Sequence, residues 1–362
     1  MQKSVSEMAR TIKALIPSDT LDGYTLKPVL KSIADEKRIR KGVLAFKEFL
    51  INLYGRLIAE GGLYDPPPKQ PKNDDSVHDN AVSLAVGCPF INNVTSILIN
   101  IGYYGDLTGN GDSMEFGNWK SLTSAVGPQG GPAKQTISAP KIIEVLRFLS
   151  SCGLSINGID LDGKKIDLAK LDVTKIVYPD DPAMLTGLKV MAFAHNDLST
   201  KNDYYIFQRC DDRSLRNEPP DSAGYLKGYV QSLSGNLQDY ILKLHQHYID
   251  EGLTCKMKTH YFGVIFSYLY KSTVVWECIP SPDGCFIVTK AHHMSEYADE
   301  IKNFHPLLRE KISKGYGCEK KRFGEPCQKG CHGFSFPLND TILDIGQDIE
   351  KWLDKELSCI KG

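Results

Sequence analysis

Hydrophobic residues recur at helical spacing through the first sixty positions of the chain. Residues three and four apart share one face of an α-helix, so this spacing predicts two amphipathic helices in the N-terminal region. Gly61-Gly62 follows the second and is expected to end it. The two stripes contain Val5, Met8, Ile12 and Leu15, and then Val43, Phe46, Leu50, Leu53 and Leu57.

A proline-rich segment follows this helical region. Residues 65–76 include Pro66-Pro67-Pro68 and Pro71 among polar residues. Proline cannot continue a helix and favours extended polyproline geometry, so the segment is interpreted as a linker. The predicted division is a helical N-terminal region over 1–64, the linker over 65–76 and a further region from residue 77.

The middle region, residues 77–222, mixes helix and strand signals. An apolar stretch to residue 104 is broken at Gly87-Cys88-Pro89 and predicts a buried helix or pair of helices. The glycine-rich residues 105–132 are interpreted as a loop. A helix ended by Gly153 and short strands between 155 and 177 come next. Pro182 is then placed to open another helix, and the polar residues that follow predict a second boundary.

The last third of the chain, residues 235–362, has the clearest pattern. A helical stripe ends at Gly252, and three β-rich runs follow, the last two joined by the turn at 280–284. Two short helices, a further strand at 334–338 and an amphipathic final helix complete the region. The order predicts an antiparallel meander flanked by helices, so the fold class of the whole chain is predicted to be α+β. The β-rich runs are 264–270, 273–279 and 286–289.

The amino-acid composition restricts the classes of partner and the compartment but indicates no specific function. The chain has 362 residues, with 43 basic and 44 acidic side chains and a formal net charge of −1. This balance supports neither a polyanion such as nucleic acid nor an anionic membrane as partner. The apolar run 84–104 contains Pro89 and three asparagines, which favours a buried segment over a membrane span. Ten cysteines and a start without an apolar leader favour a cytoplasmic protein with reduced thiols.

The most specific chemical pattern is a group of soft ligands near the C-terminus. Cys318, Cys327, Cys331 and His332 lie within fifteen residues, with glycines on both sides. Thiolates and imidazole are zinc ligands, so a structural zinc site is one interpretation. The spacing Cys-x8-Cys-x3-Cys-His matches no usual zinc-finger pattern, which leaves a redox-sensitive thiol pair or ordinary loop cysteines as alternatives. Cys331 and His332 are adjacent and would need unusual geometry to share one ion, so the fourth zinc ligand could instead come from His305 or from one of the strand cysteines.

The ending of the chain resembles a group of uncharacterised bacterial cytosolic proteins. The motifs are Lys-Gly-Tyr-Gly-Cys318, Phe-Gly-Glu-Pro-Cys327-Gln-Lys-Gly-Cys331-His332-Gly-Phe and the closing Leu-Asp-Ile-Gly-Gln-Asp-Ile-Glu-Lys-Trp-Leu-Asp. Further similarity includes the segment 178–189 and Phe207-Gln-Arg-Cys210. The resemblance implies a bacterial, cytosolic origin and supplies no activity and no catalytic residue.

Other cysteines and histidines give weaker hypotheses. Cys88 could be a catalytic nucleophile if a helix begins beside it, with His78 near in sequence; a buried, inert thiol is the alternative. If Ile279 pairs with Cys285 across the turn, Cys278 and Cys285 face opposite sides of the sheet. His245 and His247 lie about 200° apart on their helix and off its apolar stripe, so both are expected to be solvated. His292 and His293 diverge at a strand-to-helix junction and are not expected to share a metal ion.

Two further patterns are incomplete. Residues 106–112 resemble the first half of a calcium loop, but Gly117 stands where a bidentate glutamate is needed. The basic run 37–41 could contact phosphates within residues 27–60, although a short run of this kind usually forms a solvated helix end.

These observations together favour a binding or regulatory protein with a structural zinc site. The alternative is a thiol-dependent enzyme with its site between the middle and C-terminal regions, using Cys88, Cys327 or Cys331. A third hypothesis is that one face of the aromatic-rich meander forms a groove that binds a small molecule.

Overall fold

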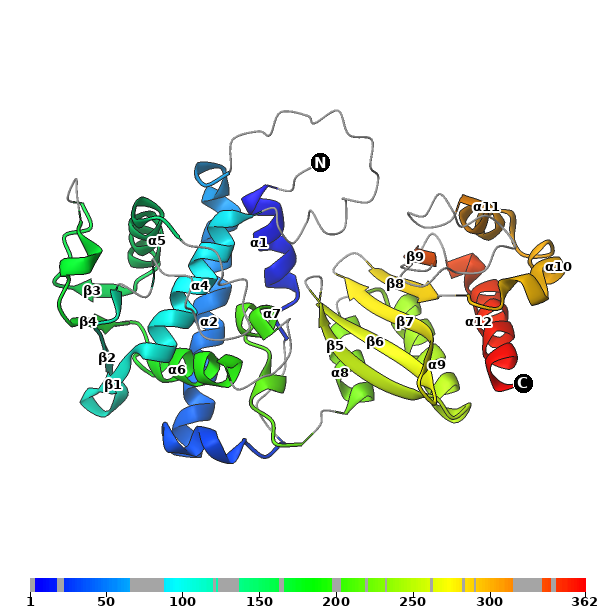
Figure 1. The fold of residues 1–362 in the computed structure, drawn as a ribbon, viewed down its shortest axis with the longest axis horizontal. Helices are drawn as coiled ribbons and strands as arrows, with labels where there is room; N and C mark the ends of the chain where they lie inside the picture. The colour runs from blue at the N-terminus through cyan, green and yellow to red at the C-terminus, as the bar shows by residue number, and fades with distance from the viewer. Residues whose placement is uncertain are drawn as a thin grey trace. The chain divides into compact units, whose positions relative to one another are not determined.

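The protein has an α+β fold with two compact units, and each is described by itself (Figure 1). Unit 1 comprises the described residues from 4 to 218, and unit 2 those from 221 to 362. The computed structural model describes residues 4–17, 23–65, 88–119, 122, 137–162, 166–196, 203–218, 221–231, 233–260, 263–281, 284–289, 291–314, 334–339 and 343–362.

Unit 1 is mainly helical and includes one small antiparallel sheet. The sheet has the strand order β1-β2-β4-β3. Its helices are α1 (Val5–Ala14), α2 (Glu36–Glu60), α4 (Pro89–Tyr104), α5 (Ala139–Ser151), α6 (Ala183–Asn196) and α7 (Asp203–Gln208). Its 3-10 turns are η1 (Pro28–Ser32), η2 (Gly61–Leu63), η4 (Gly109–Gly111), η6 (Leu168–Lys170) and η7 (Asp212–Ser214). Its strands are β1 (Asp106–Thr108), β2 (Ser113–Phe116), β3 (Ser155–Asn157) and β4 (Thr174–Val177).

The helices of unit 1 begin where the sequence supplies caps. Ser4 and Glu7 form a reciprocal capping box at the start of α1, which satisfies two backbone donors at once. Asp35 accepts from the backbone N–H of Arg38 at 3.0 Å and caps α2. Pro89 opens α4, where its missing N–H costs nothing. Each of these helix starts therefore has a local cause in the sequence.

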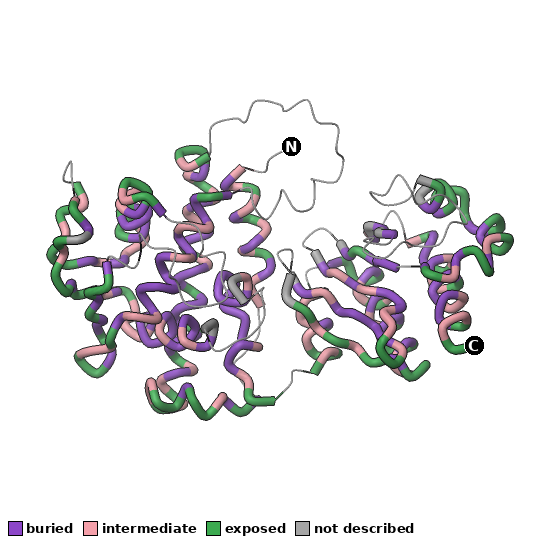
Figure 2. The backbone as a smooth tube through the Cα atoms, viewed as in Figure 1, coloured by how far each residue is buried: buried purple, intermediate pink, exposed green. Residues whose placement is uncertain are grey.

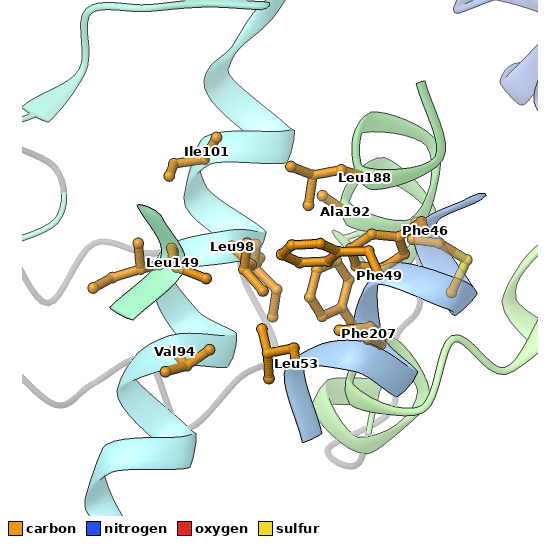
Figure 3. Packing of buried hydrophobic residues seen from close by; sticks show 14 of the residues in the cluster. Phe46, Phe49, Leu53, Val94, Leu98, Ile101, Leu149, Leu188, Ala192 and Phe207 are labelled. Carbon is orange, nitrogen blue, oxygen red and sulfur yellow. The ribbon is translucent and has the colours of Figure 1, made fainter. Parts of the chain in front are cut away.

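Close helix contacts join the N-terminal helices to the rest of unit 1. Gly42 of α2 faces Gly187 of α6, and Gly102 of α4 lies against the Leu188 carbonyl of α6. Glycine leaves room for two helix backbones to approach at these points. Figure 3 shows Phe46 and Phe49 of α2 in the core formed with α4 and α6. Residues 1–64 therefore do not form a core of their own, contrary to the predicted boundary, because the apolar stripe of α2 is buried against residues beyond the proline-rich segment.

The small sheet of unit 1 differs from expectation at residues 106–116. The sequence predicts a loop there, whereas β1 and β2 form a hairpin in which Leu107 pairs with Met114. Met114 and Phe116 are buried, so the short strands contribute to the core. Asn110 has φ 57° at the turn, a conformation that asparagine tolerates. Strands this short, within glycine-rich sequence, give too few alternating residues to be recognised.

Unit 2 is built on one antiparallel five-stranded sheet in the order β5-β6-β7-β8-β9. The predicted meander is present. The strand β5, absent from the prediction, extends it at one edge, and the predicted strand at 334–338 closes the other edge as β9. The strands are β5 (Thr254–His260), β6 (Gly263–Tyr270), β7 (Thr273–Ser281), β8 (Gly284–Thr289) and β9 (Phe334–Leu338). The helices and 3-10 turns are α8 (Ser222–Val230), α9 (Gly235–Asp250), η8 (Met294–Tyr297), α10 (Ala298–Ile301), α11 (Pro306–Lys314), η9 (Leu343–Ile345) and α12 (Gly346–Lys361).

One face of this sheet packs into the core of unit 2. Tyr268 lies opposite Trp276, and Cys278 lies opposite Ile287, all on that face. The helices α9 and α12 contribute Tyr248 and Trp352 among other buried side chains. Figure 2 shows buried positions along the strands and exposed positions at the turns and at the end of α12. The inward positions are Val264, Phe266, Tyr268, Trp276, Cys278, Cys285, Ile287, Phe334, Phe336 and Leu338.

Candidate functional site: a thiol, tyrosine and histidine cluster in unit 2

The residues predicted to bind zinc lie outside the described part of the chain. Residues 315–333 contain Cys318, Cys327, Cys331 and His332, and they connect α11 to β9. Within the described ranges, no group of three or more His, Cys, Asp or Glu side chains is arranged to hold a metal ion. The zinc hypothesis for these four residues therefore stays a prediction.

Cys88 is described and lies at the N-cap of α4, as the sequence suggests. Its side chain is 2% exposed, and its thiol donates to the carbonyl oxygen of Ser4 at 3.7 Å. Ser4 itself caps α1, so the thiol lies where the starts of two helices meet. The neighbouring candidate base, His78, lies outside the described residues. The contact with Ser4 is that of a packed structural thiol.

Two other cysteines lie far closer than the sequence predicts. The Sγ atoms of Cys278 in β7 and Cys285 in β8 are 2.9 Å apart. The observed register pairs Ile279 with Phe286 and Pro280 with Cys285. This register is one residue away from the predicted one, in which Ile279 pairs with Cys285, and a slip of one residue reverses the face of every side chain. The prediction that the two thiols face opposite sides is wrong.

These thiols belong to a buried polar cluster around Tyr268. The Tyr268 hydroxyl and His245 Nδ1 are 2.8 Å apart and share a hydrogen bond. Cys255 of β5 lies opposite Tyr268 in the sheet, and the nearby Ser222 and Tyr268 side chains act to lower the pKa of its thiol. The Tyr268 ring stacks on Trp276 with centroids 3.8 Å apart. The cluster thus links α9 to three strands of the sheet.

Burial controls the ionisation of the cluster. It raises the pKa of the Cys255 thiol to about 11 and raises the pKa of Cys278 well above the ordinary thiol range, because a thiolate is poorly solvated there. Burial likewise raises the pKa of Tyr268 and lowers the pKa of His245. All four groups are therefore held in their neutral forms, and none is poised as a nucleophile at neutral pH.

His245 was expected to be solvated, and this expectation is wrong. Its side chain is 4% exposed, because Tyr268 offers a hydrogen-bond partner inside the core. His247 follows the prediction: its side chain is 46% exposed and lies 3.2 Å from the Asp354 carboxylate of α12. The two imidazoles thus occupy different faces of α9 and do not converge.

A second buried polar group ties α12 to η8 and to the two residues before it. Glu356 is 1% exposed, and its carboxylate accepts from the backbone N–H of His292 at 2.8 Å and from the Tyr297 hydroxyl at 2.6 Å. His293 Nδ1 is 3.2 Å from the same carboxylate. The sequence contains a signal for this site: Glu356 falls on the apolar stripe of the final helix.

The remaining sequence candidates have structural roles. In the calcium-like segment, the Thr108 and Ser113 hydroxyls are 2.9 Å apart and close the β1–β2 hairpin. In the basic run, Arg38 hydrogen-bonds to Thr186 at 3.3 Å, and Arg40 pairs with Glu36 at 2.7 Å. Two of the four basic side chains of this run are thus used within unit 1.

The polar segment before unit 2 also has an internal role. Asp211 is fully buried, and its carboxylate lies 2.6 Å from the Arg213 guanidinium. Burial alone would raise the pKa of Asp211, but the charge and hydrogen bonds of Arg213 outweigh it and lower that pKa. The segment up to residue 218 is therefore part of the structure of unit 1.

Comparisons with known proteins do not place the chain in a family. No protein-family model matches the sequence, and neither a curated protein nor a solved structure matches it. The resemblance of the C-terminal ending to bacterial proteins stays a prediction. Among the described residues, no helix combines the length and the apolar character needed to cross a membrane.

Proposed function

We propose that the protein is a cytoplasmic binding or regulatory protein in which unit 2 is a scaffold for residues 315–333. In this proposal, zinc bound by Cys318, Cys327, Cys331 and His332 closes that segment. The role is structural, since the ion would hold a surface in shape rather than activate a substrate.

The observation that carries the proposal is the anchoring of both flanks of the segment. The helix α11 ends at Lys314 and buries Ile312 completely. The strand β9 begins at Phe334, which is 2% exposed and pairs with Thr289. Both ends of the nineteen-residue connection are thus held in the same core. Fixed ends lower the entropy lost when ligands between them gather around one ion.

The thiol-dependent enzyme is less well supported. A catalytic cysteine needs a thiolate, which a lowered pKa supplies. Burial instead raises the pKa of Cys152 to about 11 and that of Cys210 to about 12, as it does for Cys255. Cys152, Cys210 and Cys255 are therefore packed, unreactive thiols. Of the candidate nucleophiles, Cys88 is 2% exposed and donates to the Ser4 carbonyl oxygen, and Cys327 and Cys331 lie outside the described residues.

Metal analysis of the purified full chain tests the proposal. We expect about one zinc ion per chain in the wild type. The double variant Cys327→Ser/Cys331→Ser should lose it, and Cys359→Ser, at a thiol on α12, should retain it. Release of zinc from the wild type by a thiol-modifying reagent provides a readout that does not depend on the folding of a variant. Wild-type protein expressed with added zinc but purified without it would overturn the proposal.

A further inference from the structure

Cys278 and Cys285 are arranged as partners across the β7–β8 hairpin. Cys278 pairs with Ile287 and Cys285 with Pro280, so the two cysteines are diagonal neighbours on the inward face of the sheet. Their sulfurs are 2.9 Å apart, and the Cys285 thiol also lies 3.6 Å from the Phe286 carbonyl oxygen. Both residues are almost completely buried, at 0% and 1% exposure.

We propose that this pair is a redox-active dithiol that forms a disulfide across β7 and β8 when the protein meets a low-molecular-weight disulfide. One thiol loses its proton and attacks a sulfur of the oxidant, for example glutathione disulfide, releasing one glutathione thiol. The second cysteine then displaces the other glutathione. Two protein thiols and one glutathione disulfide thereby yield one protein disulfide and two glutathione thiols.

The distance between the sulfurs separates this reaction from metal binding. Two thiolates on one tetrahedral zinc, with bonds of ~2.3 Å, lie about 3.7 Å apart. The observed 2.9 Å is much shorter. No group of three possible ligands occurs among the described side chains, this pair included. The geometry therefore favours a bond between the sulfurs over a shared ion.

The surroundings of the pair control access to it. Strand β8 lies between β7 and β9, and the stacked Tyr268 and Trp276 rings lie on the same face of the sheet. An oxidant reaches the sulfurs when the β7–β8 hairpin opens locally. The disulfide would then hold the strands together beside Pro280 and suppress later opening. Oxidation is expected to be slow in the native protein and faster when mild denaturant increases opening.

A third thiol provides an internal comparison. Cys255 also faces inward, but strand β6 separates β5 from β7, so Cys255 is not a neighbour of the pair in the sheet. Cys255 is partly exposed, and it should remain a thiol while the pair oxidises. The inference goes beyond the proposed zinc scaffold, because it uses none of residues 315–333.

Peptide mass mapping of the full chain tests the proposal. The reduced protein is incubated with glutathione disulfide, its remaining thiols are alkylated, and it is digested with trypsin. Cys278 and Cys285 share one tryptic peptide, residues 272–290, whereas Cys255 lies in residues 244–256. We expect peptide 272–290 to lose two hydrogens and take up no alkylating agent, and peptide 244–256 to be alkylated.

Two kinds of result would overturn the inference. In the first, peptide 272–290 stays doubly alkylated even after prolonged oxidation, including in sub-denaturing urea. In the second, Cys278 or Cys285 is joined to a cysteine of another peptide. The variants Cys278→Ser and Cys285→Ser should each abolish the intrapeptide disulfide, and Cys255→Ser should leave it unchanged. The test does not require the variants to fold, because the wild-type map alone decides it.

Discussion

Gly42 of α2 and Gly187 of α6 meet backbone to backbone in the core of unit 1. A Cβ added at Gly42 would lie 2.7 Å from the Gly187 nitrogen and 2.9 Å from the Ala183 carbonyl oxygen. A Cβ added at Gly187 would collide with the Gly42 carbonyl group. Backbone atoms cannot move aside as flexible side chains can, so this contact fixes how closely the two helices approach.

Gly187→Ala is therefore expected to destabilise the protein. Alanine is the better helix former by roughly 1 kcal/mol, but forcing the helices apart should cost more, about 1–3 kcal/mol overall. Gly55→Ala is the matched control within α2, where the nearest atom to a new Cβ is Lys13 Nζ at 3.4 Å. Urea unfolding followed by circular dichroism measures both. Equal stability of the two variants would contradict the close contact.

Glu356→Gln tests the buried carboxylate of unit 2. The amide keeps the shape of the side chain, but its NH₂ group cannot accept the hydrogen bonds that one carboxylate oxygen now accepts. Leaving buried donors unpaired should cost about 1–3 kcal/mol. Glu300→Gln is the control, because Glu300 forms only an exposed ion pair with Lys355 at 2.8 Å. If the two substitutions change the free energy of unfolding by the same amount, the proposed role of Glu356 is wrong.

The buried His245 predicts a loss of stability in acid. Its pKa is lowered in the folded protein, so below the ordinary histidine value near 6.5 the unfolded chain binds a proton that the folded chain does not. The contribution is present above that pH and is lost as pH falls, by at most about 1.4 kcal/mol per pH unit. Unfolding measurements between pH 7.5 and 5.5 should show a shallower dependence for His245→Gln than for the wild type. Identical slopes would contradict the buried, neutral state.

The Cys278–Cys285 disulfide should stabilise unit 2 against unfolding. A cross-link that closes so short a loop is expected to contribute about 2 kcal/mol through the unfolded state. The oxidised and reduced wild-type proteins can be compared in urea, with Cys278→Ser under both conditions as the control. A midpoint that is lower after oxidation of the wild type would show that the sheet does not accommodate the bond.

The sequence predicted much of the fold because long amphipathic segments carry their own signal. The stripes of α2 and α12 and the alternation of β6 and β7 were recognised from spacing alone. Strand β5 was missed because its inward residues are Cys255 and Met257 and its outward residues are lysines, a weak hydrophobic alternation. The contact between Gly42 and Gly187 joins residues far apart in the sequence, and spacing carries no information about such pairs.

The candidate site depends on the exact register of the β7–β8 hairpin, which the sequence pattern did not predict. The β7–β8 hairpin was recognised, but β7 continues to Ser281 and β8 begins at Gly284, so the register differs by one residue from the assumed one. That single step brings Cys278 and Cys285 together. The placement of His245 off the apolar stripe of α9 was also wrong: His245 is four residues after Ile241 and three before Tyr248, so it lies on the buried face of the helix.

We propose that unit 2 contains two separate sets of thiols among its cysteines, a zinc-binding set at Cys318, Cys327 and Cys331 and a buried dithiol at Cys278 and Cys285. Time-resolved alkylation of the native, reduced protein, with and without a chelator, tests this claim most directly. Trypsin places the three cysteines of the first set in separate peptides, so each can be followed alone.

We expect a chelator to accelerate the labelling of Cys318, Cys327 and Cys331 greatly and to leave Cys278 and Cys285 slowly labelled in both conditions. Labelling of the first three at the same rate with and without chelator, or fast labelling of the buried pair in the native protein, would contradict it.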